Sequence, residues 1–146
     1  MEAFRSLNEI YYRNANCCLL VYDITRKDSF VDCKGYFFEK LREKCDKDIP
    51  VILLGNKSDL EDEREVPSED GANFAKDNEF LFLETSCLKN KNVADAFETL
   101  VELTHRKMLE KKNELDNNEK QKEKGNNIKI SNKETKKKKT KILCCN

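Results

Sequence analysis

Three short apolar runs divide the chain and predict its β-strands. They cover residues 17–22, 49–54 and 80–83, and none of them alternates polar with apolar positions. Strands that read as continuous apolar runs are covered on both faces, as in parallel sheets. The sequence therefore predicts three strands inside a layered domain.

Helical patterns lie before, between and after these strands. Residues 30–45 form an amphipathic pattern whose apolar side holds Phe37, Phe38 and Leu41. Ser68 follows Pro67 as the candidate N-cap of a shorter helix. Apolar spacings of three and four predict a helix at each end: Phe4, Leu7, Ile10 and Tyr11 in the first, and Val93, Phe97, Leu100, Thr104 and Met108 in the last.

The alternation of helices and strands predicts an α/β fold with a parallel sheet. Strands that are joined by helices form right-handed crossovers, so they run in the same direction. Ligands of such sheets bind beyond the carboxyl ends of the strands. The polar residues that follow Leu54 and Leu83 lie at that edge, which makes them candidates for a binding site.

The first of these polar segments suits a guanine base. In "VILLGNKSDL", residues 51–60, the strand is followed by Asn56, Lys57 and Asp59. Guanine presents two adjacent donors, N1–H and N2–H₂, and a carboxylate presents two adjacent acceptors. The same carboxylate would be left unpaired against adenine, which makes the pairing selective. An Asn can bond a ring nitrogen and tie neighbouring loops, and a Lys stem can lie along a flat base.

The second polar segment is "ETSC", residues 84–87, whose backbone N–H groups can reach the guanine oxygen. An alternative interpretation treats "NKSD" as a simple turn, because Asn, Ser and Asp favour turns by themselves. The presence of a second polar loop after the third strand favours a nucleotide site.

Several motifs together resemble the second half of a Rab-family small GTPase. They occur in the family's order over about residues 1–110, and the clearest are "YYRNA" (11–15), "LLVYDIT" (19–25), "LLGNKSDLE" (53–61), "ETSC" (84–87) and "NVADAF" (92–97). The resemblance implies the C-terminal part of a Ras-like P-loop GTPase fold, without its first three strands and its P-loop. It also implies GTP or GDP as the ligand.

The resemblance assigns roles to particular residues. Asn56, Lys57 and Asp59 correspond to the guanine-specificity motif, and the amides of Ser86 and Cys87 correspond to those that meet the base. Cys87 replaces the usual alanine, which is a small change for a backbone contact. Leu88 replaces the usual lysine and puts one contact beside the base in doubt.

The phosphate chemistry of the family has no counterpart in this sequence. The phosphate loop GxxxxGK[ST] is not found among the four glycines, and neither are the switch threonine and the DxxG segment. Met1 stands where the family keeps the glutamine that orients the attacking water. We therefore expect no catalytic residue, no metal site, very weak guanine binding and no hydrolysis. Mg²⁺ is expected only in a complete protein.

Two explanations are compatible with this partial resemblance. The chain is a fragment of a longer Rab, which would act as a GTP-dependent regulator of vesicle transport. Alternatively, it is a degenerate Rab: a membrane-tethered interaction protein that works without nucleotide and competes for escort or prenylation machinery. Either protein would lie on the cytoplasmic face of endomembranes and cycle with the cytosol.

Charge separates the chain into two parts. Lys and Arg together equal Asp and Glu at 28 each, but residues 116–146 hold ten lysines and four acidic residues. The composition predicts a partial GTPase domain over 1–115 and a disordered basic tail over 116–146. Because the domain itself is acidic, nucleic acid is not an expected partner.

The last residues predict a lipid anchor. Cys144 and Cys145 in "ILCCN" resemble the double-cysteine prenylation signal of Rabs, and the lysines at 136–139 and 141 would add attraction to anionic lipids. The alternative is a solvated tail or a nuclear-localisation run. Ile128 and Ile130 resemble the aliphatic motif that engages the Rab escort protein. The expected partners are this escort protein, geranylgeranyl transferase, GDI and Rab effectors.

Tyr11, Asp23, the cysteines and His105 are further candidates for a functional role. Tyr11 resembles an aromatic that Rabs present to effectors, but it could equally pack in the core. Asp23 has no partner His or carboxylate in the pattern, so a structural role is expected. The seven cysteines form no CxxC pair and His105 is the only histidine, which argues against structural zinc and favours reduced thiols.

Overall fold

The computed structural model describes residue 12 and residues 14–130, with side chains described through Leu115 and at Asn117. The chain divides into two units, Met1–Met108 and Leu109–Asn146. The first unit contains the sheet and its covering helices. The predicted helix through Phe4 and Tyr11 lies outside the described residues.

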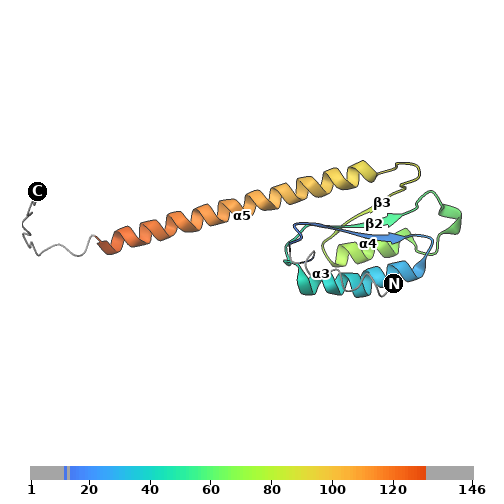
Figure 1. Ribbon diagram of the computed structural model, residues 1–146, viewed down its shortest axis with the longest axis horizontal. Helices are drawn as coiled ribbons and strands as arrows, with labels where there is room; N and C mark the ends of the chain where they lie inside the picture. Colours follow the sequence, from blue (N-terminus) through green and yellow to red (C-terminus); the bar gives the residue numbers. More distant parts are fainter. Residues whose placement is uncertain (1–11, 13, 131–146) are drawn as a thin grey trace, which may run out of the picture. The chain divides into compact units, whose positions relative to one another are not determined.

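The sheet has three parallel strands, as the sequence predicts, and they lie in the order β1-β2-β3 (Figure 1). They are β1 (Cys18–Asp23), β2 (Val51–Asn56) and β3 (Leu81–Glu84). Asp23 is opposite Asn56, and Gly55 is opposite Glu84. The carboxyl ends of all three strands therefore meet at one edge of the sheet.

The helices after β1 form one continuous helical segment with a π-helical turn in it. Its parts are α2 (Lys27–Asp32), η2 (Cys33–Phe37) and α3 (Phe38–Lys44). Leu41 is buried and Phe38 is half-buried, as predicted, but Phe37 is 42% exposed. The π turn is one reason why a regular 3.6-residue period assigns Phe37 to the wrong side.

Between β2 and β3 the chain forms η3 (Glu61–Glu63) and α4 (Ser68–Asp77). Ser68 is the first residue of α4 and Pro67 holds the N-cap position without a side-chain bond, so the predicted cap is wrong by one residue. Gly71 lets α4 lie close to the sheet. A Cβ atom there would be 2.5 Å from Tyr22 Oη and 2.7 Å from the Phe82 ring.

Two apolar clusters lie on opposite faces of the sheet. Alternate residues of β2 point to opposite faces. Leu53 packs with Leu20, Tyr22 and Phe30 in one cluster, on the side of α2–α4. The other cluster contains Ile52, Leu54, Leu83, Ala96 and Leu100. The prediction that both faces are covered is confirmed for β2, whereas Val21 of β1 is 53% exposed.

The last helix, α5 (Val93–Ile130), buries Leu100 as predicted, but the rest of its buried stripe differs from the predicted one. Ala96 and Leu100 are buried and Leu103 is partly buried against the sheet, but Phe97 is 57% exposed and Met108 is 49% exposed. The buried stripe is displaced from the predicted one because small Ala96, rather than large Phe97, lies against β2. Periodicity alone does not indicate which of two neighbouring stripes a sheet will cover.

Residues 109–130 of the second unit continue as helix, where the composition predicts disorder from residue 116. Lys, Glu and Gln, which are frequent in this segment, are good helix formers, and a helix needs no core of its own to satisfy its backbone. Of the described helices, none is both long and apolar enough to cross a membrane.

Candidate functional site

Two loops meet at the carboxyl edge of the sheet, where the sequence predicts a binding site. One follows β2 and carries Asn56, Lys57 and Asp59; the other follows β3 and carries Thr85 and Ser86. The loops are adjacent because β2 and β3 are neighbours in register. Residues nearly 30 positions apart are thus brought together by the parallel topology.

Backbone and side-chain bonds hold the two loops together. Ser58 N–H donates to Thr85 O at 3.0 Å, and Thr85 N–H donates to Gly55 O at 2.9 Å. Thr85 Oγ1 lies 3.3 Å from Asn56 Oδ1, to which it donates. Asn56 therefore ties the neighbouring loop, as the sequence suggests.

Asp59 is the acidic group of the site, and Ser86 holds it in place. The fully buried Ser86 donates its hydroxyl proton to Asp59 Oδ1. This hydrogen bond lowers the pKa of Asp59 below its usual value of 3.8. The carboxylate is therefore charged at neutral pH, which is the state that accepts the two donors of guanine.

The backbone amide of Ser86 has a different role from the one that the family resemblance implies. Its N–H donates to Lys91 O at 3.1 Å, and Lys91 N–H donates back to Ser86 O at 2.9 Å. The contribution of Ser86 is therefore its hydroxyl on Asp59. Within residues 14–130, Cys87 N–H donates to no acceptor, so this amide remains available to a base oxygen.

Lys57 is fixed by Asp23, which lies at the end of the neighbouring strand. Lys57 Nζ is 2.7 Å from Asp23 Oδ2, and Asp23 Oδ1 accepts from Thr25 N and Thr25 Oγ1 at 2.9 and 2.7 Å. Burial raises the pKa of Asp23, but the hydrogen bonds from Lys57 and Thr25 outweigh it and leave that pKa below 3.8. Asp23 thus has the structural role that the sequence suggests, and it directs the Lys57 side chain.

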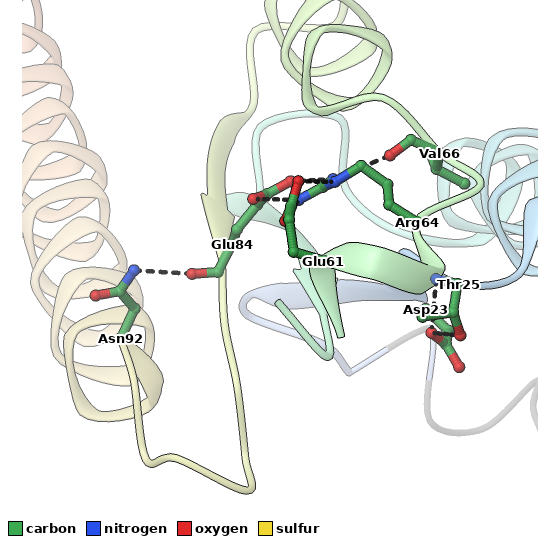
Figure 2. A network of polar contacts seen from close by, with 7 residues as sticks. All are labelled: Asp23, Thr25, Glu61, Arg64, Val66, Glu84 and Asn92. Atoms are coloured by element: carbon green, nitrogen blue, oxygen red, sulfur yellow. Dashed lines mark hydrogen bonds and ion pairs between the residues drawn. The ribbon is translucent and has the colours of Figure 1, made fainter. Parts of the chain in front are cut away.

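Arg64 joins the two loops through its guanidinium group (Figure 2). This role was not predicted from the sequence. Its guanidinium donates to both oxygens of Glu61 at 2.7 Å and to both oxygens of Glu84 at 2.8 and 3.0 Å. It also donates to Val66 O at 3.0 Å. Glu84 is the last residue of β3, directly before the second loop, and Glu61 follows the first loop. The Arg64 guanidinium therefore holds both loops. Glu61 and Arg64 are three residues apart, a spacing at which opposite charges can pair, and this feature of the sequence indicates their ion pair.

Asn92 closes the second loop against the start of α5. Its side-chain amide donates to Glu84 O at 2.8 Å, as Figure 2 shows. Lys89 N–H also donates to Ser86 Oγ at 3.0 Å. The serine hydroxyl that holds Asp59 is thereby held in turn by the backbone of the same loop.

The remaining predicted residues are exposed or not described. Cys87 and Leu88 are exposed, Leu88 to 83%. Tyr11, Cys144, Cys145 and the lysines at 136–141 lie outside the described residues, as do the side chains of Ile128 and Ile130, whose backbone is helical. In the described part of the chain, no three His, Cys, Asp or Glu residues are placed to hold a metal ion.

The residues at this edge fit a guanine base. An ionised carboxylate, an amide side chain, an available backbone N–H and a Lys stem converge on two bonded loops. This edge therefore offers both acceptors and donors to a planar base.

Comparison with known proteins gives the family. The model of the Ras family matches residues 1–106. Ras-related protein RABA4b of Arabidopsis thaliana is 46% identical over 100 residues, which are 68% of this chain and 44% of the relative. Ras-related protein RGP1 of Oryza sativa subsp. japonica is 43% identical over 118 residues, 81% of this chain and 51% of the relative.

Similarity extends to an animal protein, Ras-related protein Rab-17 of Homo sapiens. It is 42% identical over 101 residues, which are 69% of this chain and 48% of the relative. The chain spans about half the length of the curated relatives that it matches. The chain belongs to the Ras family and, within it, to the Rab small GTPases.

Proposed function

We propose that this chain provides the guanine-recognition half of a Rab-type small GTPase that regulates vesicle-mediated transport at the cytoplasmic face of endomembranes. The observation that carries the proposal is the placement of Asp59. The buried hydroxyl of Ser86 holds its carboxylate ionised between the loops that follow β2 and β3.

Each group at the edge has a separate task in this proposal. Asp59 accepts the N1–H and N2–H₂ donors of guanine, and Cys87 N–H donates to the guanine oxygen. Asn56 bonds a ring nitrogen while it holds Thr85, and the Lys57 stem, directed by Asp23, covers one face of the base. Adenine would offer the carboxylate no pair of donors, which makes the pairing selective for guanine.

Phosphate binding, Mg²⁺ binding and hydrolysis are not assigned to these residues. In the family these steps depend on GxxxxGK[ST], and this sequence contains no such loop. Base contacts alone are expected to give weak affinity, and GTP turnover belongs to a complete protein in which a phosphate loop faces this edge.

A nucleoside titration tests the base-recognition proposal directly. We expect guanosine to bind the full chain more tightly than adenosine by roughly tenfold, because only guanosine offers the Asp59 carboxylate two adjacent donors. Asp59→Asn replaces one acceptor by a donor, so it should weaken guanosine and favour xanthosine, which has an oxygen where guanine has its amine. Ligand-observed NMR is sensitive enough for weak binding.

The exposed Asp62, on η3, provides the matched control. Asp62→Asn removes the same charge and should leave the preference for guanosine unchanged. Equal binding of guanosine and adenosine by the wild-type chain would refute the proposal, and so would an Asp59→Asn variant that keeps its preference for guanosine.

The membrane part of the function rests on the sequence of the tail. We assign lipidation to Cys144 and Cys145, contact with the escort protein to Ile128 and Ile130, and an effector contact to Tyr11. Geranylgeranyl transferase, GDI and Rab effectors are the remaining partners. A purified escort protein and transferase should attach prenyl groups to the chain, and a variant with both cysteines changed to Ser should accept none.

The double cysteine and the lysine run of the tail are compatible with a second function as well: a membrane-tethered interaction protein that acts without nucleotide. In that function the chain competes for escort and prenylation machinery or for effectors. The nucleoside titration separates the two functions. The tethered protein should be prenylated and should bind no nucleoside selectively, whereas a guanine half should do both.

A further inference from the structure

A cavity lies at the opposite edge of the sheet, beside the amino ends of β2 and β3. Its volume is about 320 Å³, and it belongs to the first unit of the chain. Strand β2 begins here at Val51 and ends at Asn56 in the guanine loop, so the two sites lie at opposite ends of the same strand. No residue of the guanine site lines the cavity.

The cavity has an apolar floor and a basic rim. The floor is formed by Ile49, Pro50, Val51, Phe80, Leu81 and Leu103. Four cations lie around it, namely Arg42, Lys47, Arg106 and Lys107, with the carboxylates of Asp48 and Glu79 and the amide of Asn78 between them. Positive charge is therefore in excess, although the first 115 residues are acidic as a whole.

Two of these cations are held in fixed positions. The Arg42 guanidinium lies over the rings of Phe38 and Phe80, 5.2 and 5.6 Å from their centroids, and donates to Asn78 O at 3.4 Å. Lys107 Nζ donates to Asp48 O at 2.6 Å, which joins α5 to the loop before β2. A guanidinium fixed by aromatic rings keeps donors available for an anion.

The other two cations of the cavity are the exposed Lys47 and Arg106. Among the residues that the structure describes, no ion pair joins Lys47 or Arg106 to a carboxylate. Both side chains are exposed at the rim. Cations without partners on a concave surface attract anions, and the low-dielectric wall of a cavity strengthens that attraction.

We propose that this cavity binds a phosphorylated polyol ring, of the inositol phosphate class. Phosphates pair with the four cations, and ring hydroxyls donate to the carboxylates of Asp48 and Glu79. The C–H face of the ring lies on the apolar floor formed by Ile49, Leu81 and Leu103. The ligand is either a free inositol phosphate or the headgroup of a phosphoinositide lipid, because both present the same chemistry.

Calorimetric titration of the full chain with inositol trisphosphate at physiological salt tests the proposal. The double variant Lys47→Gln/Arg106→Gln should weaken binding by about tenfold or more, since it removes two charge-assisted contacts to phosphate. Both side chains are exposed, so the variant should keep the circular dichroism spectrum and the melting temperature of the wild type.

A second pair of exposed cations, Arg26 and Lys76, provides the matched control because neither lines the cavity. Arg26→Gln/Lys76→Gln removes the same two charges and should change the affinity by less than about twofold. Added guanosine should not displace the probe. No measurable binding by the wild type, or equal losses in the two double variants, would overturn the proposal.

Vesicles distinguish the two sources of the ligand. The lysines at 136–139 and 141 are first changed to Gln, because they would bind any anionic membrane. If this variant sediments with vesicles that contain phosphatidylinositol bisphosphate, and does so only with Lys47 and Arg106 intact, the ligand is a lipid headgroup. If the chain binds soluble inositol trisphosphate but does not sediment with these vesicles, the ligand is the free compound.

Discussion

At the scale of single residues, the site is fixed by bonds between side chains that lie far apart in sequence. Asp59 depends on Ser86, and both loops depend on Arg64. The candidate base contacts could be predicted because Asn56, Lys57 and Asp59 form one short motif. The role of Arg64 could not be predicted in this way, because its partner Glu84 is twenty positions away and only folding brings Glu84 to the guanidinium.

Removing the planar guanidinium of Arg64 should loosen both loops together. Arg64→Lys keeps the charge but cannot donate to Glu61, Glu84 and Val66 at once. The Arg64 side chain is 15% exposed and that of Glu84 is 21% exposed, so the pair is mostly shielded from water. We expect a loss of about 1–3 kcal/mol in the free energy of unfolding by urea, and weaker guanosine binding.

Glu61→Gln is the control for this prediction, because Glu61 is 65% exposed and its ion pair is largely screened. Its effect on the free energy of unfolding should be clearly smaller than that of Arg64→Lys. An Arg64→Lys variant as stable as the wild type would show that the network does not hold the loops.

The two carboxylates of the site make stability depend on pH. Asp23 and Asp59 both have pKa values below 3.8 in the folded chain. A carboxyl whose pKa is lowered on folding stabilises the chain above its unfolded pKa, and this contribution is lost as pH falls through the folded value. The melting temperature should therefore fall as the pH drops below about 4. Asp23→Asn should reduce that slope, and an unchanged slope in this variant would contradict the prediction.

At the scale of elements, the sequence predicts what depends on local pattern. Strand positions and the parallel order follow from apolar runs separated by helices, and the structure confirms them. The phase of a helix depends on its neighbours, so Phe97 and Phe37 were assigned to the wrong sides. Composition predicts disorder over 116–130 because the segment cannot build a core, whereas the structure has helix there, which the helix propensity of Lys, Glu and Gln favours.

The approach of α4 to the sheet gives a test at this scale. Gly71→Ala places a methyl group 2.5 Å from Tyr22 Oη and 2.7 Å from Phe82, so α4 must move away from β1 and β3. Overpacking of this kind costs about 1–3 kcal/mol, which exceeds the gain of about 1 kcal/mol in helix propensity. Urea unfolding should show a net loss of stability.

Gly35→Ala is the matched control, since no atom lies within 4 Å of the added methyl group. It should be neutral or should stabilise the chain by up to about 1 kcal/mol, because alanine restricts the unfolded chain more than glycine does. Equal effects of the two substitutions on the free energy of unfolding would show that the close contacts at Gly71 do not disfavour a methyl group there.

At the scale of the whole folded unit, the α5 face of the sheet carries exposed apolar side chains. Val21 of β1 is 53% exposed, and Phe97 and Val101 of α5 are 57% and 66% exposed. In the part of the chain that is described, β1 pairs with β2 alone, so its other edge has no strand partner. A flat apolar edge strand beside exposed apolar groups favours self-association.

We therefore expect the average mass of the chain in solution to rise with concentration, as measured by sedimentation equilibrium. Val21→Lys should suppress the association, because a charge on an edge strand opposes pairing with another copy. Val31 is 54% exposed on α2, at the other face of the sheet, so Val31→Lys adds the same charge and should leave the association unchanged. If the wild-type chain is monomeric at every concentration, this face and edge do not mediate self-association. If both lysine variants suppress the association equally, it results from low net charge and not from the edge of β1.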